Sequence, residues 1–124
     1  MPKKTKNHTA TFRRIALSLP QAYESSHMAH PDFRVPLPKG KIFATLFCSN
    51  DALDTEDRGM VKLTPDQQDE FVEAHPTIFS PIKGTWGLQG CTQVELSKAT
   101  ATVLKKALTT AWRNAAPKSL LISI

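Results

Sequence analysis

The stretch His30-Pro-Asp-Phe-Arg-Val-Pro-Leu-Pro-Lys-Gly-Lys-Ile-Phe-Ala-Thr-Leu46 decides the fold. Phe33–Val35 predicts one short strand, and residues 41–47, which are apolar on both alternating faces, predict a central strand covered on both sides. The segment Pro36–Gly40 predicts a tight turn between them, because proline fixes φ and glycine accepts a positive φ. Two strands joined by so short a turn pair antiparallel, so an antiparallel hairpin lies at the centre of the fold.

Helices are predicted on both sides of this hairpin. Residues 9–19 place apolar side chains at helical spacing and end at Pro20. Thr64-Pro-Asp-Gln67 is a capping box that starts a second helix ending near Ala74. Ser97 is predicted to cap a long last helix that ends before Pro117.

The remaining segments predict further strands and loops. Residues 22–29 are a weak strand candidate, and 60–63 are a better one. Two glycine-punctuated segments, 78–82 and 86–94, also have strand character, whereas the acidic stretch 48–57 is predicted to be a solvated loop.

The predicted order indicates an α+β domain: an antiparallel β-sheet with the N- and C-terminal helices packed on one face, as a two-layer sandwich. The chain of 124 residues is long enough for one hydrophobic core. We expect residues 1–8 to form a flexible basic tail and 9–124 to form a single domain.

Composition excludes several classes of protein. No apolar run is long enough to span a membrane, and the basic N-terminus is followed by no apolar segment typical of a secretory signal. Cys48 and Cys91 lack CxxC spacing, which favours free thiols in the cytoplasm over a disulfide or a reactive cysteine.

Charge is distributed unevenly along the chain. Residues 1–23 and 97–124 each carry five basic residues and no acidic one, whereas 24–96 carry all eleven acids. The net charge is +5. Basic ends around an acidic centre raise the possibility of a polyanionic partner.

Four blocks in the same order resemble the MmcQ/YjbR family. They are the 30–44 stretch, Val61–Leu63 leading into the second helix, Trp86 between glycines, and 111–118 at the end of the last helix. The resemblance implies a CyaY-like fold, a double-wing arrangement, DNA binding and no defined catalytic residue. Iron binding through acidic residues of the first helix, as in frataxin-type relatives of that fold, is not expected, because Arg13 and Arg14 stand there without an acid.

The predicted nucleic-acid-binding residues are the bases of the terminal helices and of two turns, which can contact phosphates without reading sequence. They are Arg13, Arg14, Lys39, Lys41, Lys83, Lys98, Lys105, Lys106 and Arg113. On the last helix Lys98, Lys106 and Arg113 share one stripe with Thr102 and Thr109, and Lys105 flanks it. The alternative interpretation is a solvated helix face and ordinary exposed turns.

Other functions receive weaker support. A protein- or small-ligand-binding module with a site near Arg34 and Trp86 is the alternative to DNA binding. A protein partner or a second copy of the chain could dock on the apolar C-terminal tail, 120–124. No metal site, cofactor or enzymatic activity is predicted, since nucleotide-binding, hydrolase and zinc motifs are absent from the sequence.

Overall fold

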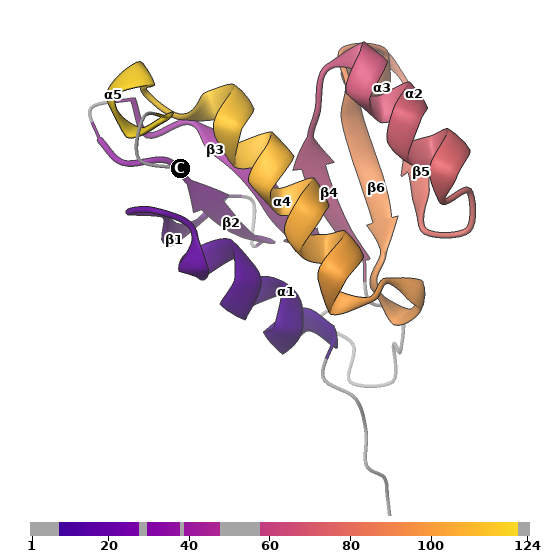
Figure 1. The fold of residues 1–124 in the computed structure, drawn as a ribbon, viewed down its shortest axis with the longest axis horizontal. Helices are drawn as coiled ribbons and strands as arrows, with labels where there is room; N and C mark the ends of the chain where they lie inside the picture. The colour runs from indigo at the N-terminus through magenta and orange to yellow at the C-terminus, as the bar shows by residue number, and fades with distance from the viewer. Residues whose placement is uncertain (1–7, 28–29, 38, 48–57, 122–124) are drawn as a thin grey trace, which may run out of the picture.

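A six-stranded antiparallel sheet forms the frame of the molecule in the computed structural model (Figure 1). The structure describes residues 8–27, 30–37, 39–47 and 58–121. Its strands are β1 (Tyr23–His27), β2 (His30–Arg34), β3 (Ile42–Phe47), β4 (Arg58–Lys62), β5 (Phe79–Pro81) and β6 (Cys91–Glu95). Their order across the sheet is β1-β2-β3-β4-β6-β5, so β3 and β4 occupy the centre.

Two helices lie side by side on one face of the sheet, namely α1 (His8–Ser18) and α4 (Ala101–Ala115) (Figure 1). The shorter elements are α2 (Pro65–Ala74), α3 (Thr85–Leu88), a 3-10 turn at Leu96–Lys98 and α5 (Lys118–Leu121). Helix α2 packs on the edge strand β5, where the Phe71 and Phe79 rings meet edge to face at 5.1 Å. The predicted α+β sheet with terminal helices on one face is confirmed.

The core lies between this pair of helices and the sheet. Phe12 of α1 packs on Phe33 of β2, with ring centroids 5.9 Å apart. Trp112 of α4 is fully buried. Burying side chains of this size contributes about 1.5–3 kcal/mol each, which explains why the apolar stripes of α1 and α4 both face inward.

The predicted central hairpin is present as β2 and β3. Val35 N–H donates to the Lys41 carbonyl (3.0 Å), and Gly40, at φ +57°, closes the turn. Phe33 pairs with Ala44 but Arg34 pairs with Ile42, so Phe43 is an extra residue in β3. The bulge interrupts strict alternation where β3 begins.

The capping box of α2 is confirmed. Thr64 Oγ1 accepts from Gln67 N–H (3.2 Å), and Gln67 Oε1 accepts from Thr64 N–H (2.9 Å). These two bonds and Pro65 at the first helical position fix the start of the helix.

Two local predictions are wrong. The segment 86–94 is a strand only from Cys91 onward, in β6; Trp86 lies in the four-residue helix α3, which Gln68 of α2 contacts at the Gly87 carbonyl. Ser97 does not cap the last helix; it lies in the 3-10 turn, and Thr100 Oγ1 accepts the capping bond from Val103 N–H (3.2 Å).

The C-terminal segment includes α5, in which Leu120 and Leu121 are half-buried against the core. Residues 1–7, the acidic stretch 48–57 with Cys48, and 122–124 lie outside the described residues. Among the described helices, none is long and apolar enough to cross a membrane.

Candidate functional site

Four strand ends and the end of α4 meet at one end of the sheet. Because the strands alternate in direction, the end of β2 lies beside the start of β3, the end of β4 and the start of β6. A hollow of about 540 Å³ opens there, and we call it the basic groove. Its lining residues are Arg34, Lys39, Gly40, Lys41, Ile42, Lys62, Leu63, Thr64, Trp86, Gln89, Cys91, Ala111, Asn114 and Ala115.

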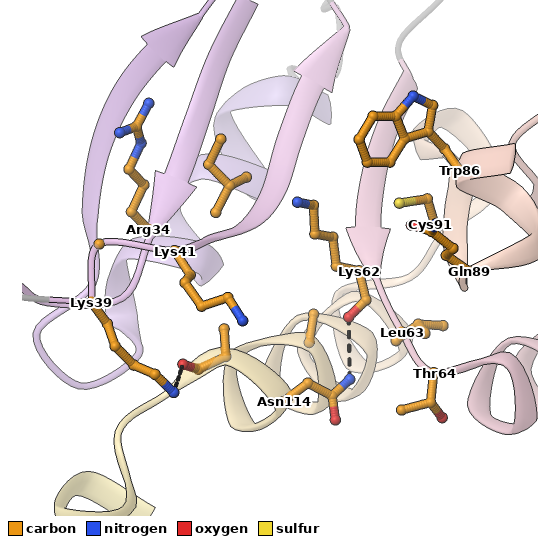
Figure 2. Close-up of a pocket in the computed structure, with 14 residues that line it drawn as sticks. Arg34, Lys39, Lys41, Lys62, Leu63, Thr64, Trp86, Gln89, Cys91 and Asn114 are labelled. Carbon is orange, nitrogen blue, oxygen red and sulfur yellow. Dashed lines mark hydrogen bonds between the residues drawn. The ribbon is translucent and has the colours of Figure 1, made fainter.

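Four cationic side chains line the basic groove. Arg34, Lys39 and Lys41 come from the β2–β3 hairpin, and Lys62 ends β4. In Figure 2 the Lys62 ammonium points into the space between the β2–β3 hairpin and Trp86, and the Lys41 ammonium points toward α4. None of the described residues that line the groove is Asp or Glu. The local field therefore favours an anion.

Lys39 ties the hairpin turn to the end of α4. Its Nζ donates to the carbonyl of Ala115, the last residue of the helix (3.1 Å; Figure 2). A cation there offsets the negative end of the helix dipole, which would otherwise repel an anion. The main role of Lys39 is therefore to hold the hairpin turn against the end of α4, since its ammonium is already bonded to the Ala115 carbonyl.

Arg34 is held by a buried carboxylate. Asp32, two residues earlier on the same strand face, is fully buried. Arg34 Nε donates to Asp32 Oδ1 (2.8 Å) and Arg34 Nη2 donates to Oδ2 (3.1 Å). His27 Nδ1 donates to the same Oδ2 (2.7 Å).

The ionised form of Asp32 is stabilised by these bonds. Burial alone would raise the pKa of Asp32, but the hydrogen bonds and charges of Arg34 and His27 outweigh it and hold the pKa below the usual value. Asp32 in turn raises the pKa of Arg34, so the guanidinium stays charged, but the Asp32 carboxylate offsets that charge and the free positive charge of the groove comes from Lys41 and Lys62.

The opposite wall of the groove is Trp86, a residue of helix α3 that is 62% exposed. Gly87, the next residue, fixes the helix, because a Cβ there would lie 1.6 Å from the Ile82 carbonyl oxygen. Gln68 Nε2 of α2 approaches the Gly87 carbonyl (3.1 Å), the Cys91 carbonyl (3.0 Å) and Thr92 Oγ1 (3.1 Å). A large exposed ring is therefore presented from a rigid support.

Asn114 of α4 connects the elements that form the floor of the groove. Its Nδ2 donates to the Lys62 carbonyl (3.2 Å; Figure 2) and to Gln67 Oε1 (2.8 Å). The backbone that carries Lys62 is thereby bound to both α4 and the start of α2.

A smaller hollow of about 210 Å³ adjoins the groove, and we call it the recess. It is lined by His27, Ile42, Thr45, Met60, Lys62, Ile82, Trp86 and Cys91, of which Ile42, Lys62, Trp86 and Cys91 also line the groove. Burial raises the pKa of the Cys91 thiol and Lys62 offsets part of that rise, so Cys91 is a protonated wall residue at neutral pH.

Comparison with known proteins decides the family. A family model described as YjbR matches residues 17–114. The chain belongs to the YjbR family. The predicted membership is confirmed, and the matched region includes the groove residues from Arg34 to Asn114.

A solved structure shows the same fold as this YjbR protein. The crystal structure of Deinococcus radiodurans protein DR2400, with domain DUF419, is 18% identical and has a TM-score of 0.68. The match covers 93% of this chain and 86% of that one. A search of curated proteins found no match.

The residues predicted to bind nucleic acid do not form one site in this YjbR protein. Lys39 and Lys41 line the groove. Lys83, exposed in the segment after β5, and Arg113, exposed in the last turn of α4, belong to the same end of the sheet. The two predicted turns therefore lie at one end.

The other predicted bases lie elsewhere. Arg14 and Lys98 line a separate hollow near the start of α4, and Lys105 and Lys106 are exposed along the helix. Arg13 Nε is paired with Glu24 Oε1 at 2.9 Å, so its charge is locally neutralised.

Among the groove residues that the sequence did not indicate as site residues are Lys62, Gln89 and Asn114. They come from three different elements, and only the strand order brings them together. The alternative site near Arg34 and Trp86 does coincide with the groove. Within the described part of the chain, no cluster of three His, Cys, Asp or Glu side chains could hold a metal ion.

Proposed function

We propose that this YjbR protein binds DNA mainly through phosphate contacts, and that the basic groove with its adjoining turns is the contact surface. The observation that carries the proposal is the convergence of Lys41 and Lys62 on one hollow whose described lining has no carboxylate. Lysine and arginine bind phosphate by charge and hydrogen bonds without reading base sequence.

The groove is better placed for this role than the face of α4. Its cations come from the β2–β3 hairpin and the end of β4, at one end of the sheet, and Arg34 is fixed by Asp32. The exposed bases of α4 lie on a convex helix surface. Phosphate contacts of this kind give weak, sequence-independent binding, with a Kd of about 10⁻⁴–10⁻⁶ M at physiological salt.

A charge-matched pair of double variants tests the proposal. Lys41→Gln/Lys62→Gln removes two groove cations, and Lys105→Gln/Lys106→Gln removes two from α4. Binding of a short duplex is measured by fluorescence anisotropy over a range of salt concentrations. The groove variant should weaken binding and lower the slope of log K against log salt by about 2, since each lost phosphate contact lowers it by about 1.

Two results would contradict the proposal. An α4 variant that loses as much affinity as the groove variant would move the interface to the helix or reduce it to net charge. Absence of any wild-type binding to duplex or single-stranded DNA at low salt would reject DNA binding itself.

A second candidate function is the binding of a small anionic ligand, with no catalysis. The groove volume favours it, because about 540 Å³ lies within the range of about 300–1,000 Å³ typical of ligand pockets. The YjbR family is not a known enzyme family. A thermal shift with inorganic pyrophosphate that is lost in Lys41→Gln/Lys62→Gln, without duplex binding, would favour this candidate.

A further inference from the structure

Beside the groove, the recess has a different chemistry. Its walls include Ile42, Met60, Ile82 and the exposed indole of Trp86. Thr45 and Met60 pair across β3 and β4, and their neighbours Ala44 and Val61 belong to the core under the helices. Because side chains alternate along a strand, the recess lies on the sheet face away from α1 and α4.

The recess contains an unsatisfied polar atom. Thr45 is 1% exposed, and its Oγ1 has no hydrogen-bond partner among the described residues. Buried hydroxyls are normally paired, so an orphan in the wall of a hollow indicates a site that a ligand atom completes. His27 adds a second polar group: its Nδ1 is occupied by Asp32, which leaves Nε2 to face a ligand.

The size of the recess limits what it can hold. About 210 Å³ is smaller than a typical site for a whole drug-sized ligand and suits one flat ring system. Trp86 and Lys62 belong to both hollows, so a ring in the recess and a phosphate in the groove can be covalently joined.

We infer that the recess takes one unpaired nucleobase, stacked on Trp86, while the phosphates on either side of it lie in the basic groove. The inference rests on the proposed function and deepens it, because it makes single-stranded or locally unpaired nucleic acid the preferred ligand. A base within a duplex cannot enter the recess without leaving its stack. Stacking on an aromatic side chain and edge contacts from Thr45 and His27 supply the preference.

Trp86 gives a direct spectroscopic signal. The chain has two tryptophans, and Trp112 is fully buried. A base stacked on the exposed indole should quench the emission of Trp86. Titration of the full chain with a single-stranded oligonucleotide should show this quenching, and a blunt duplex of the same length should quench little.

Variants separate stacking from phosphate binding. Trp86→Ala should weaken binding of the single strand at least about fivefold, the lower limit for losing one stacked base, and should weaken it more than it weakens duplex binding. Leu88→Ala is the matched control, because Leu88 is exposed on the same helix and lines neither hollow. Thr45→Val should leave the fold intact and weaken only the single strand, since it removes the orphan hydroxyl.

The outcomes are distinguishable. In one outcome, wild type and Trp86→Ala bind the single strand equally while duplex binding still depends on Lys41 and Lys62. That result would overturn the assignment of a base to the recess and leave the proposed function standing. Failure of both nucleic acids to bind would reject the proposed function. Equal quenching and affinity with a free nucleoside monophosphate would overturn the assignment to a polymer, because neighbouring phosphates would then add nothing.

Discussion

Replacing Asp32 with alanine should destabilise the fold more than any other single change of charge among the described ion pairs. Asp32 is fully buried and accepts three hydrogen bonds, two from Arg34 and one from His27. Removing one partner of a buried ion pair costs about 3–5 kcal/mol. Here the side chains of Arg34 and His27 are 27% and 40% exposed, so water compensates part of the loss. We expect a decrease of about 2–3 kcal/mol in the free energy of unfolding.

Urea unfolding followed by circular dichroism measures the effect. If the free energy of unfolding falls by about 2 kcal/mol per M of urea, the urea concentration at the unfolding midpoint should decrease by about 1–1.5 M at neutral pH. The control is Glu24→Gln, which removes the exposed pair with Arg13 and should cost at most about 1 kcal/mol. A midpoint for Asp32→Ala within about 0.3 M of wild type, at that same slope, would refute the argument.

The pH dependence provides a second test of the same carboxylate. Its pKa is lowered in the folded state, so its contribution is fully present above the ordinary value of 3.8. That contribution is lost as the pH falls below this value and through the folded-state pKa. The difference between wild type and Asp32→Ala should therefore shrink in acid, and a difference unchanged between pH 7 and strong acid would contradict the assignment.

Three further variants test the supports of the groove. Thr64→Ala removes the capping box of α2 and should lower the free energy of unfolding by about 1 kcal/mol in a urea titration, whereas no change would show that Pro65 alone fixes the helix start. Gln68→Ala removes the bonds of a buried amide to the Gly87 carbonyl and Thr92 Oγ1, which keep their bonds to Gly90, and should cost about 1 kcal/mol; an unchanged thermal midpoint would exclude this role. Gly87→Ala places a Cβ against the Ile82 carbonyl and should cost about 1–3 kcal/mol and shift Trp86 emission, so a wild-type spectrum and stability would refute the close packing of α3.

The parts of the fold that were predictable from sequence depend on local signals. The hairpin of β2 and β3 has a proline–glycine turn between apolar runs, and the start of α2 has a complete capping box. Helix α3 has no such signal. It spans four residues, its N-cap Gly84 makes no side-chain bond, and Gln68 from another helix holds it.

The candidate site was predictable only in part. Asp32 and Arg34 are two residues apart on one strand, so their pairing follows from the period of a β-strand. Lys62 and Asn114 are 52 positions apart, and nothing local indicates that they meet. Their convergence depends on β4 lying between β3 and β6 and on where α4 ends.

The packing of α1 against α4 has a consequence for synthesis on the ribosome. Phe12 emerges early but lies in the same buried cluster as Leu104, Leu108 and Trp112, which emerge much later. The nascent chain therefore exposes the apolar face of α1 and one face of the sheet until α4 has left the exit tunnel. This core is therefore completed only after α4 has emerged, and the incomplete chain is a substrate for chaperones during that interval.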